Sequence, residues 1–400
     1  MPREELPNIE TRRELFDYLE QQMNRSYRQV LDTGVLLSDR PFLKSFIFEF
    51  DWDPDNLGKN EVEYLKESLT IPSGSAARQS SPPSIKETDE AGFYQVQWQW
   101  RRSRPTLLYL DTATDPQRRF WLGYSLADAA DLNLVVERLA QRVPAFDRAW
   151  LWPSFLESTQ DLGEFRGIGL DYDYRRFENK EGMADSTNYF KVQIWGGPGT
   201  REILKFIGGH KDFRGRTVLA KVRMKFWDDL DARDRFALED IKYNGKFLSR
   251  GTSFDSHQTL LSETRNLYAK KIRSIETQHV IRSVDEADGG WVEGDPVFFE
   301  FTEHPIENLD AFCEVVFSGH MPFRLWGTPR AIPGRDKGLA VSAVDLHTGS
   351  KLFFEVYHDV VCMYLYPGAC GNTVARFFTN LQHTFSRLVA AKDNENQDVL

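Results

Sequence analysis

The residues that decide the fold are LAVSAVDL (339–346), KLFFEVY (351–357) and VVCMYLY (360–366), preceded by FRLWGT (323–328). Each is an apolar or aromatic run of strand length that polar or turn-forming residues bound. His347-Thr348-Gly349 supplies the turn between the first two runs. These four runs predict consecutive antiparallel strands.

Helices flank this group of strands. Before it, VFFEF (297–301) predicts one more strand, and 304–319 predicts a helix with Pro305 early and Gly319 at its end. After it, TVARFFTNLQHTFSRLV (373–389) predicts the closing helix. The order of one strand, one helix, four strands and one helix is similar to that of one half of the saddle-forming TATA-binding protein. The resemblance is one of element order, without a shared sequence motif.

Similar orders recur near residues 44–142 and 188–276. The sequence therefore predicts an α+β fold of two or three related units, each an antiparallel sheet backed by helices. We expect the following divisions: an N-terminal docking helix in 1–40, a first unit in 41–150 with a mobile polar excursion at 71–92, a second and basic unit in 151–285, a third unit in 286–392, and a polar tail in 393–400.

Composition limits the class of protein. A chain of 400 residues with 41% hydrophobic residues is globular and long enough for more than one domain. It has no apolar run of the length that spans a membrane, and its charged N-terminus lacks the apolar stretch of a secretory signal. Cys313, Cys362 and Cys370 are too few for a disulfide framework. We expect a soluble cytoplasmic protein without a membrane partner, and its oligomeric state stays open.

Charge is distributed unevenly along the chain. The net charge is −10, yet residues 201–283 contain 18 Lys and Arg against 11 Asp and Glu, an excess of +7 that leaves −17 for the remainder. In TVLAKVRMKFW (217–227), the period of two places Lys221, Arg223 and Lys225 on one strand face. Cations beside aromatic residues are what a nucleic-acid groove or an acidic protein partner requires. A half-solvated sheet is the alternative interpretation.

Further cations extend this hypothesis. Arg101 and Arg102 follow Trp98 and Trp100 in the first unit, which repeats the combination of cations and aromatic residues. The long helix predicted at 256–275 adds three more. The candidate contacts to nucleic acid or to a partner are Lys221, Arg223, Lys225, Lys270, Lys271, Arg273, Arg101 and Arg102.

Two groups of carboxylates suggest metal ions. Asp171 and Asp173 alternate on a strand, as a metal-dependent nuclease would need, although Arg175 makes an ordinary ion pair the alternative. Asp51, Asp53 and Asp55 resemble part of a calcium loop. An EF-hand would need Gly where Asn56 stands and Glu where Val62 stands, so a polar turn before a helix is the other interpretation. No cofactor is predicted beyond a calcium or magnesium ion at that loop.

Three smaller features have structural alternatives. Gly196-Gly197-Pro198-Gly199 lies between a strand and a helix, where a phosphate could bind or where the chain could simply turn. Cys370 could be activated at a helix start, but the nearest helical histidine, His383, is too far along the helix to act as its base. His210 lies in a polar loop without a partner at a fixed spacing.

The sequence favours a non-catalytic binding or scaffold protein that engages nucleic acid or an acidic partner through its basic middle sheet. No constellation of catalytic residues is recognisable, and the catalytic residues of an enzyme, if it were one, are unknown. The alternatives are a metal-dependent phosphodiesterase or nuclease that uses its clustered carboxylates, and a subunit of a multiprotein complex.

Overall fold

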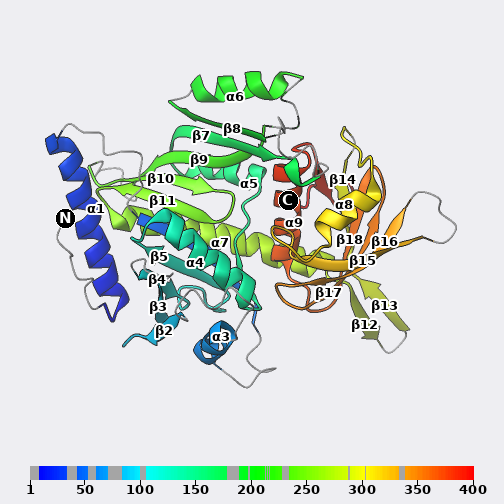
Figure 1. Ribbon diagram of the computed structural model, residues 1–400, viewed down its shortest axis with the longest axis horizontal. Helices are drawn as coiled ribbons and strands as arrows, with labels where there is room; N and C mark the ends of the chain where they lie inside the picture. The colour runs from blue at the N-terminus through cyan, green and yellow to red at the C-terminus, as the bar shows by residue number, and fades with distance from the viewer. Residues whose placement is uncertain are drawn as a thin grey trace. The chain divides into compact units, whose positions relative to one another are not determined.

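The computed structural model describes residues 9–33, 43–52, 60–70, 83–99, 105–177, 189–196, 199–211, 213, 215, 217–227, 234–286, 289–301, 303–332 and 338–400. Its fold is α+β, with helices on antiparallel sheets, as the sequence predicts (Figure 1). The chain divides into two compact units. The first contains 1–148, 225–240 and 246–265, and the second contains 149–224, 241–245 and 266–400. The segment 151–285, predicted as one unit, therefore contributes to both.

The first compact unit contains one strand, one helix, four strands and one helix in succession. The strands pair antiparallel in the order β2-β3-β4-β5-β1, and β11 and β6 also pair with β1. Strand β2 lies within the segment predicted as a polar excursion, whose residues 71–82 are outside the described residues. The bounds are α1 (Arg12–Thr33), β1 (Leu43–Phe50), α3 (Glu61–Thr70), β2 (Ser84–Glu87), β3 (Phe93–Trp98), β4 (Thr106–Asp111), β5 (Phe120–Ser125), α4 (Ala129–Arg142), β6 (Phe146–Arg148) and β11 (Lys246–Gly251).

Helices cover both faces of this sheet. Apolar side chains from α3 and α4 form a core with one face, in which Leu65, Leu132 and Trp121 are fully buried. The other face carries α1, where Phe16 packs against Tyr124 with ring centroids 5.8 Å apart. Arg12 of α1 also pairs with Asp111 at 2.9 Å. The predicted N-terminal helix therefore docks on the sheet of its own unit.

The second compact unit ends in a sheet with the order β15-β16-β17-β18-β14-β19, which we call the C-terminal sheet. Both sheets contain a meander of four consecutive strands, β2 to β5 in one and β15 to β18 in the other. The last strand of each meander pairs with the strand before the first helix, so β5 pairs with β1 and β18 pairs with β14. Phe299 and Phe354 pack on Phe377 of α9, which therefore covers one face. The bounds are β14 (Val297–Glu300), α8 (Leu309–Val316), β15 (Leu325–Ala331), β16 (Leu339–Asp345), β17 (Lys351–Val356), β18 (Val360–Leu365), α9 (Gly371–Thr384) and β19 (Ala390–Lys392).

The observed elements depart from the predicted ones at their ends. Helix α8 begins after Asn308, whose side chain accepts a hydrogen bond from the Ala311 N–H, so the cap overrides the earlier Pro305. Helix α9 ends at Thr384 because the chain turns into β19, which pairs with β14. The tail after Lys392 returns to it through a bridge to Asp398. These contacts are tertiary and leave no local signal in the sequence.

The middle of the chain does not repeat this pairing. Strand β8 pairs with the preceding strand β7 in a hairpin, and β9 lies on the other side of β7.

No helix in the described part of the chain is long and apolar enough to cross a membrane. The remaining bounds are α5 (Pro153–Ser158), the 3₁₀ helices η2 (Thr159–Leu162) and η3 (Arg175–Phe177), β7 (Glu164–Asp173), β8 (Tyr189–Trp195), α6 (Gly199–Gly209), β9 (Leu219–Phe226), β10 (Ala237–Lys242), α7 (Phe254–His279), β12 (Arg282–Glu286) and β13 (Gly289–Glu293).

Candidate nucleic-acid interface

Strand β8, with the sequence YFKVQIW, presents one row of side chains to solvent. Tyr189, Lys191, Gln193 and Trp195 alternate along the strand and are all exposed, and we call this row the β8 face. Tyr189 is 45% exposed and Trp195 is 37% exposed. Exposed aromatic rings on one row of a strand offer faces on which a planar group can stack.

Glycines in β7 make room for this row. Gly167 lies opposite Trp195 and Gly169 lies opposite Gln193 in the hairpin register. A Cβ at Gly167 would be 2.5 Å from Cε3 of Trp195, and one at Gly169 would be 3.2 Å from Cβ of Lys221. Side chains at these two positions would therefore push Trp195 and Lys221 away from the surface of β7.

Two cations lie against the indole of Trp195. The guanidinium Cζ of Arg223 is 3.5 Å from the ring centroid, and Nζ of Lys221 is 4.3 Å from it. Nζ of Lys221 also donates to Oε1 of Gln193 at 3.3 Å. A cation over the face of a tryptophan is attracted by the ring quadrupole. These contacts orient Trp195 and give the β8 face a positive character.

The alternation predicted for β9 is confirmed in part. Val218, Val222 and Met224 are fully buried, as their face requires. Lys221 and Arg223 are only 8% and 9% exposed, because Trp195 covers them. Lys221 and Arg223 therefore contact an aromatic residue of β8, Trp195, which the sequence did not single out.

Two carboxylates lie beside the β8 face, and each has a cation near it. Nη2 of Arg175 forms an ion pair with Oδ2 of Asp173 at 2.7 Å, and Cζ of Arg175 lies 4.7 Å from the ring centroid of Tyr189. Burial raises the pKa of Asp171, while the charges of Lys191 and Lys242 act in the opposite direction. Within the described ranges, Asp171 and Asp173 belong to no group of three residues that could hold a metal ion. Among the described residues named for this surface, the cations Arg175, Lys191, Lys221 and Arg223 lie near the carboxylates Asp171 and Asp173.

The other predicted contact residues lie elsewhere or outside the described residues. Lys225 belongs to the first compact unit, where its Nζ is 3.9 Å from the ring centroid of Phe236. On α7, Lys270 is exposed, whereas Lys271 and Arg273 are half-buried. Arg101, Arg102, Asp53 and Asp55 lie outside the described residues, and Asp51 is 3.6 Å from Nε of Arg119.

The remaining candidates from the sequence are Cys370, His210 and the glycine-rich turn. Cys370 is the N-cap residue of α9 and is buried, so a substrate cannot approach its thiol. His210 is exposed, and its ring centroid lies 5.6 Å from that of Phe213. In the glycine-rich turn, Gly197 and Pro198 lie outside the described residues, and Gly199 begins α6.

A serine, a histidine and a glutamate in the first compact unit form a contiguous network. Oγ of Ser45 is 2.8 Å from Nε2 of His257, and Nδ1 of His257 is 2.8 Å from Oε1 of Glu239. Ser249 donates to the same Oε1 at 2.5 Å. The linkage matches that of a serine hydrolase triad. All of these side chains are 0% exposed, so a substrate cannot reach Ser45, and the network is part of the core.

We expect His257→Ala to lower the free energy of unfolding by about 1–3 kcal/mol, because it removes the histidine partner of buried Ser45 and leaves Glu239 with Ser249 alone of the two partners in this network. Urea unfolding measures this loss. The exposed His210 is the control, and His210→Ala should change the free energy by less than about 0.5 kcal/mol. A fluorophosphonate reagent should leave the folded protein unmodified. Labelling of Ser45 that disappears in His257→Ala would instead show a reactive serine.

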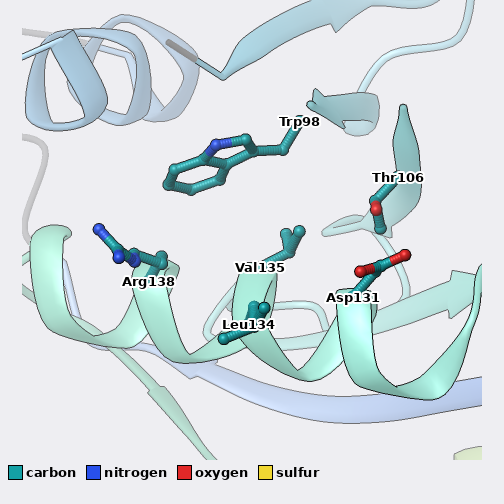
Figure 2. Close-up of a pocket in the computed structure, with 6 residues that line it drawn as sticks. All are labelled: Trp98, Thr106, Asp131, Leu134, Val135 and Arg138. Carbon is teal, nitrogen blue, oxygen red and sulfur yellow. The ribbon is translucent and has the colours of Figure 1, made fainter. Parts of the chain in front are cut away.

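A small pocket in the first compact unit is too small for a nucleotide. In Figure 2, the indole of Trp98 faces side chains of α4 across it. Its volume of about 10 Å³ is room for roughly one water molecule. Its lining residues are Trp98, Thr106, Asp131, Leu134, Val135 and Arg138.

Comparison with known proteins places the whole chain in one family. The model of the MJECL33-like protein family matches residues 3–399. The chain belongs to that family. A relative from Methanocaldococcus jannaschii, described as uncharacterized protein MJECL33, is 28% identical over 95% of this chain and 93% of its own length. Membership thus covers both compact units, and the family description names no ligand or reaction.

Proposed function

We propose that this protein binds single-stranded nucleic acid through the β8 face. The observation that carries the proposal is the pair of exposed aromatic residues, Tyr189 and Trp195, which share one strand face with exposed Lys191, while Lys221 and Arg223 lie against the indole of Trp195. Bases that are unpaired stack on aromatic side chains, whereas a duplex keeps its bases stacked on one another. Exposed rings on an open strand therefore favour a single-stranded ligand.

The geometry of β8 suits an extended ligand. Tyr189 and Trp195 are six positions apart on one face, which is about 20 Å along a strand. Lys191 is exposed between them, where it can contact a phosphate, and Gln193 supplies a hydrogen-bonding amide. The chain has a net charge of −10, so this local positive surface would direct a polyanion to one place.

Fluorescence anisotropy with labelled oligo-dT and oligo-rU at low salt tests the proposal. Trp195→Ala should weaken binding about 5- to 150-fold, which corresponds to the roughly 1–3 kcal/mol that stacking on one base contributes. Lys191→Glu should also weaken binding, and the affinity of the wild type should fall steeply as salt rises. A duplex of the same length should bind more weakly than the single strand.

Two variants serve as matched controls. Trp291 is 45% exposed on β13, and Lys66 is exposed on α3 of the first compact unit. Trp291→Ala and Lys66→Glu should bind oligonucleotides as the wild type does. Failure of the wild type to bind at low salt, or equal binding by Trp195→Ala, would refute the proposal. Magnesium-dependent cleavage that Asp171→Asn abolishes would favour a phosphodiesterase instead.

A further inference from the structure

Gln193 lies between Lys191 and Trp195 on the β8 face, and its side chain is held by a cation from a strand that is not its neighbour. Strand β7 lies between β8 and β9 in the sheet (Figure 1). Strand β9 is therefore two strand spacings, or about 10 Å, from β8. Nζ of Lys221 on β9 nevertheless donates to Oε1 of Gln193 at 3.3 Å. The lysine side chain reaches β8 across Gly169, which pairs with Gln193 in the hairpin register.

The lack of a side chain at Gly169 permits this contact. A Cβ at that position would lie 3.2 Å from both Cβ and Cε of Lys221 and 3.9 Å from Cγ of Gln193. Because carbon atoms pack best at about 3.5–4.0 Å, an added methyl group would push the lysine stem aside. The ammonium of Lys221 also lies 4.3 Å from the ring centroid of Trp195. A packed stem and two contacts therefore fix the position of this ammonium.

The contact with Lys221 determines which atoms Gln193 offers to a ligand. A lysine ammonium has three donors and no acceptor, so an amide beside it must turn its carbonyl oxygen towards it. The two N–H donors of Gln193 then remain on the exposed side of the strand. A glutamine that reads adenine uses one donor and one acceptor, and this pairing needs the oxygen that Lys221 holds. Gln193 therefore suits a base edge that presents hydrogen-bond acceptors.

We propose that Gln193 determines base specificity on the β8 face and selects bases with an exocyclic carbonyl over bases with an exocyclic amino group. This inference rests on the proposed binding of single-stranded nucleic acid. Uracil and thymine present O4 and guanine presents O6 as acceptors, whereas cytosine and adenine present amino groups as donors. An N–H of Gln193 meets an acceptor in the first class and another donor in the second. Lys221 is a positioning residue, because it acts on the base through Gln193.

A base that stacks on Trp195 is within reach of this amide. Gln193 and Trp195 are two positions apart on one strand face, which is about 7 Å. Stacking on the indole fixes the plane of a base whatever its identity, and the amide then contacts the edge of that base. Affinity for any single strand and discrimination among bases thus come from different side chains, so they can be tested separately.

Fluorescence anisotropy with labelled oligo-rU and oligo-rC of equal length measures the preference. The two probes carry the same backbone and the same charge, so the ratio of their affinities removes the electrostatic contribution. At neutral pH, the wild type should bind oligo-rU about threefold to tenfold more tightly, which is the effect of about one hydrogen bond. Equal affinities would overturn this inference and leave the proposed function standing. Failure to bind either probe would overturn both.

Gln193→Glu should reverse the preference. The change replaces the N–H donors by a second carboxylate oxygen, and a carboxylate accepts a hydrogen bond from N4 of cytosine. Its negative charge should weaken the binding of both probes, but oligo-rC should now bind more tightly than oligo-rU. Because Gln193 is exposed, the variant should fold as the wild type does. A wild-type ratio in Gln193→Glu would refute the role of Gln193.

Gln97→Glu is the matched control. Gln97 is also an exposed glutamine within a strand, but it lies on β3 of the first compact unit. The same change of charge at this position should leave the ratio of the two affinities as in the wild type. If Gln97→Glu shifts the ratio as Gln193→Glu does, the shift comes from net charge and not from the amide of Gln193.

Lys221→Met tests the positioning role of Lys221. The variant keeps an unbranched apolar stem and removes the ammonium, so the amide of Gln193 can turn and present its oxygen to the base. Affinity for both probes should fall because a cation is lost, and the ratio between them should approach one. A role of Lys221 that is only electrostatic or structural would weaken both probes equally. An unchanged ratio would therefore contradict its action through Gln193.

Discussion

Replacing Asp345 by alanine should lower the free energy of unfolding by about 3–5 kcal/mol, because it removes the counter-charge of a buried arginine. Arg376 on α9 is 0% exposed, and its Nη2 donates to Oδ1 of Asp345 at 2.5 Å. Its Nε donates to the carbonyl oxygen of Phe323 at 2.9 Å. Thr373 also donates to Asp345. The pair connects the end of β16 to α9, so its loss should loosen the helix on the C-terminal sheet.

A second ion pair in the same compact unit provides the control. Arg175 and Asp173 form an ion pair at 2.7 Å, but their side chains are 42% and 33% exposed. Asp173→Ala should therefore cost less than about 1 kcal/mol. Urea unfolding followed by tryptophan fluorescence compares the two variants. If Asp345→Ala and Asp173→Ala lower the free energy of unfolding equally, burial does not make the Asp345–Arg376 pair more important than the exposed one.

The double variant Asp345→Leu/Arg376→Met separates an unpaired charge from a lost contact. A buried ion pair replaced by apolar residues of similar volume is often close to neutral, whereas removal of one partner is costly. The double variant should therefore be more stable than Asp345→Ala. If it is less stable, hydrogen bonds to Thr373 and Phe323 dominate this site instead.

The second large effect is a loss of stability in acid that depends on His383. Burial lowers the pKa of His383 to about 3, although a hydrogen bond with the backbone of Asp171 opposes the shift. The imidazole stacks on Tyr243 with ring centroids 4.0 Å apart. The folded protein therefore keeps His383 neutral, while the unfolded chain takes up a proton below an ordinary pKa of about 6.5.

The sign of the effect follows from this difference in proton binding. Because the pKa is depressed in the folded state, the stabilisation is complete above about pH 6.5 and is lost as the pH falls towards about 3. The loss should approach about 1.4 kcal/mol per pH unit, or roughly 2–3 kcal/mol between pH 6 and pH 4. Other groups also titrate in this range, so the comparison with a variant is what isolates His383.

His383→Phe keeps an aromatic ring beside Tyr243 and removes the titrating group. Urea unfolding of the wild type and of this variant between pH 7 and pH 4 should show a shallower decline for the variant. The difference between their slopes measures the contribution of His383. Parallel slopes would mean that His383 takes up its proton equally well in the folded state.

Local patterns predicted the C-terminal sheet well. In KLFFEVY, Leu352, Phe354 and Val356 alternate, and all three are buried. Strand β2, with the sequence SIKE, was missed because Ile85 is its one apolar residue and the three others are exposed. Pairing with β3 makes it a strand, and this hydrogen bonding comes from a neighbour rather than from its own composition.

In the candidate interface, too, the sequence predicted some features and could not predict others. Alternation in β9 predicted cations on one face, but it could not show that Trp195 covers Lys221 and Arg223. The row of exposed residues in YFKVQIW was readable from its period of two, and its aromatic residues at both ends were the available signal. The glycines that make room for Trp195 and Lys221 become meaningful only in the hairpin register.

The sequence alone determined the α+β class, the positions of most strands and the buried faces of the regular ones. It did so because apolar periodicity is a local property that each segment carries by itself. Only the tertiary structure decided which strands pair, why Ser45 meets His257 at a separation of 212 residues, and which cations lie against Trp195. These contacts join residues that are distant in the chain, and their formation depends on burial and register that no single segment specifies.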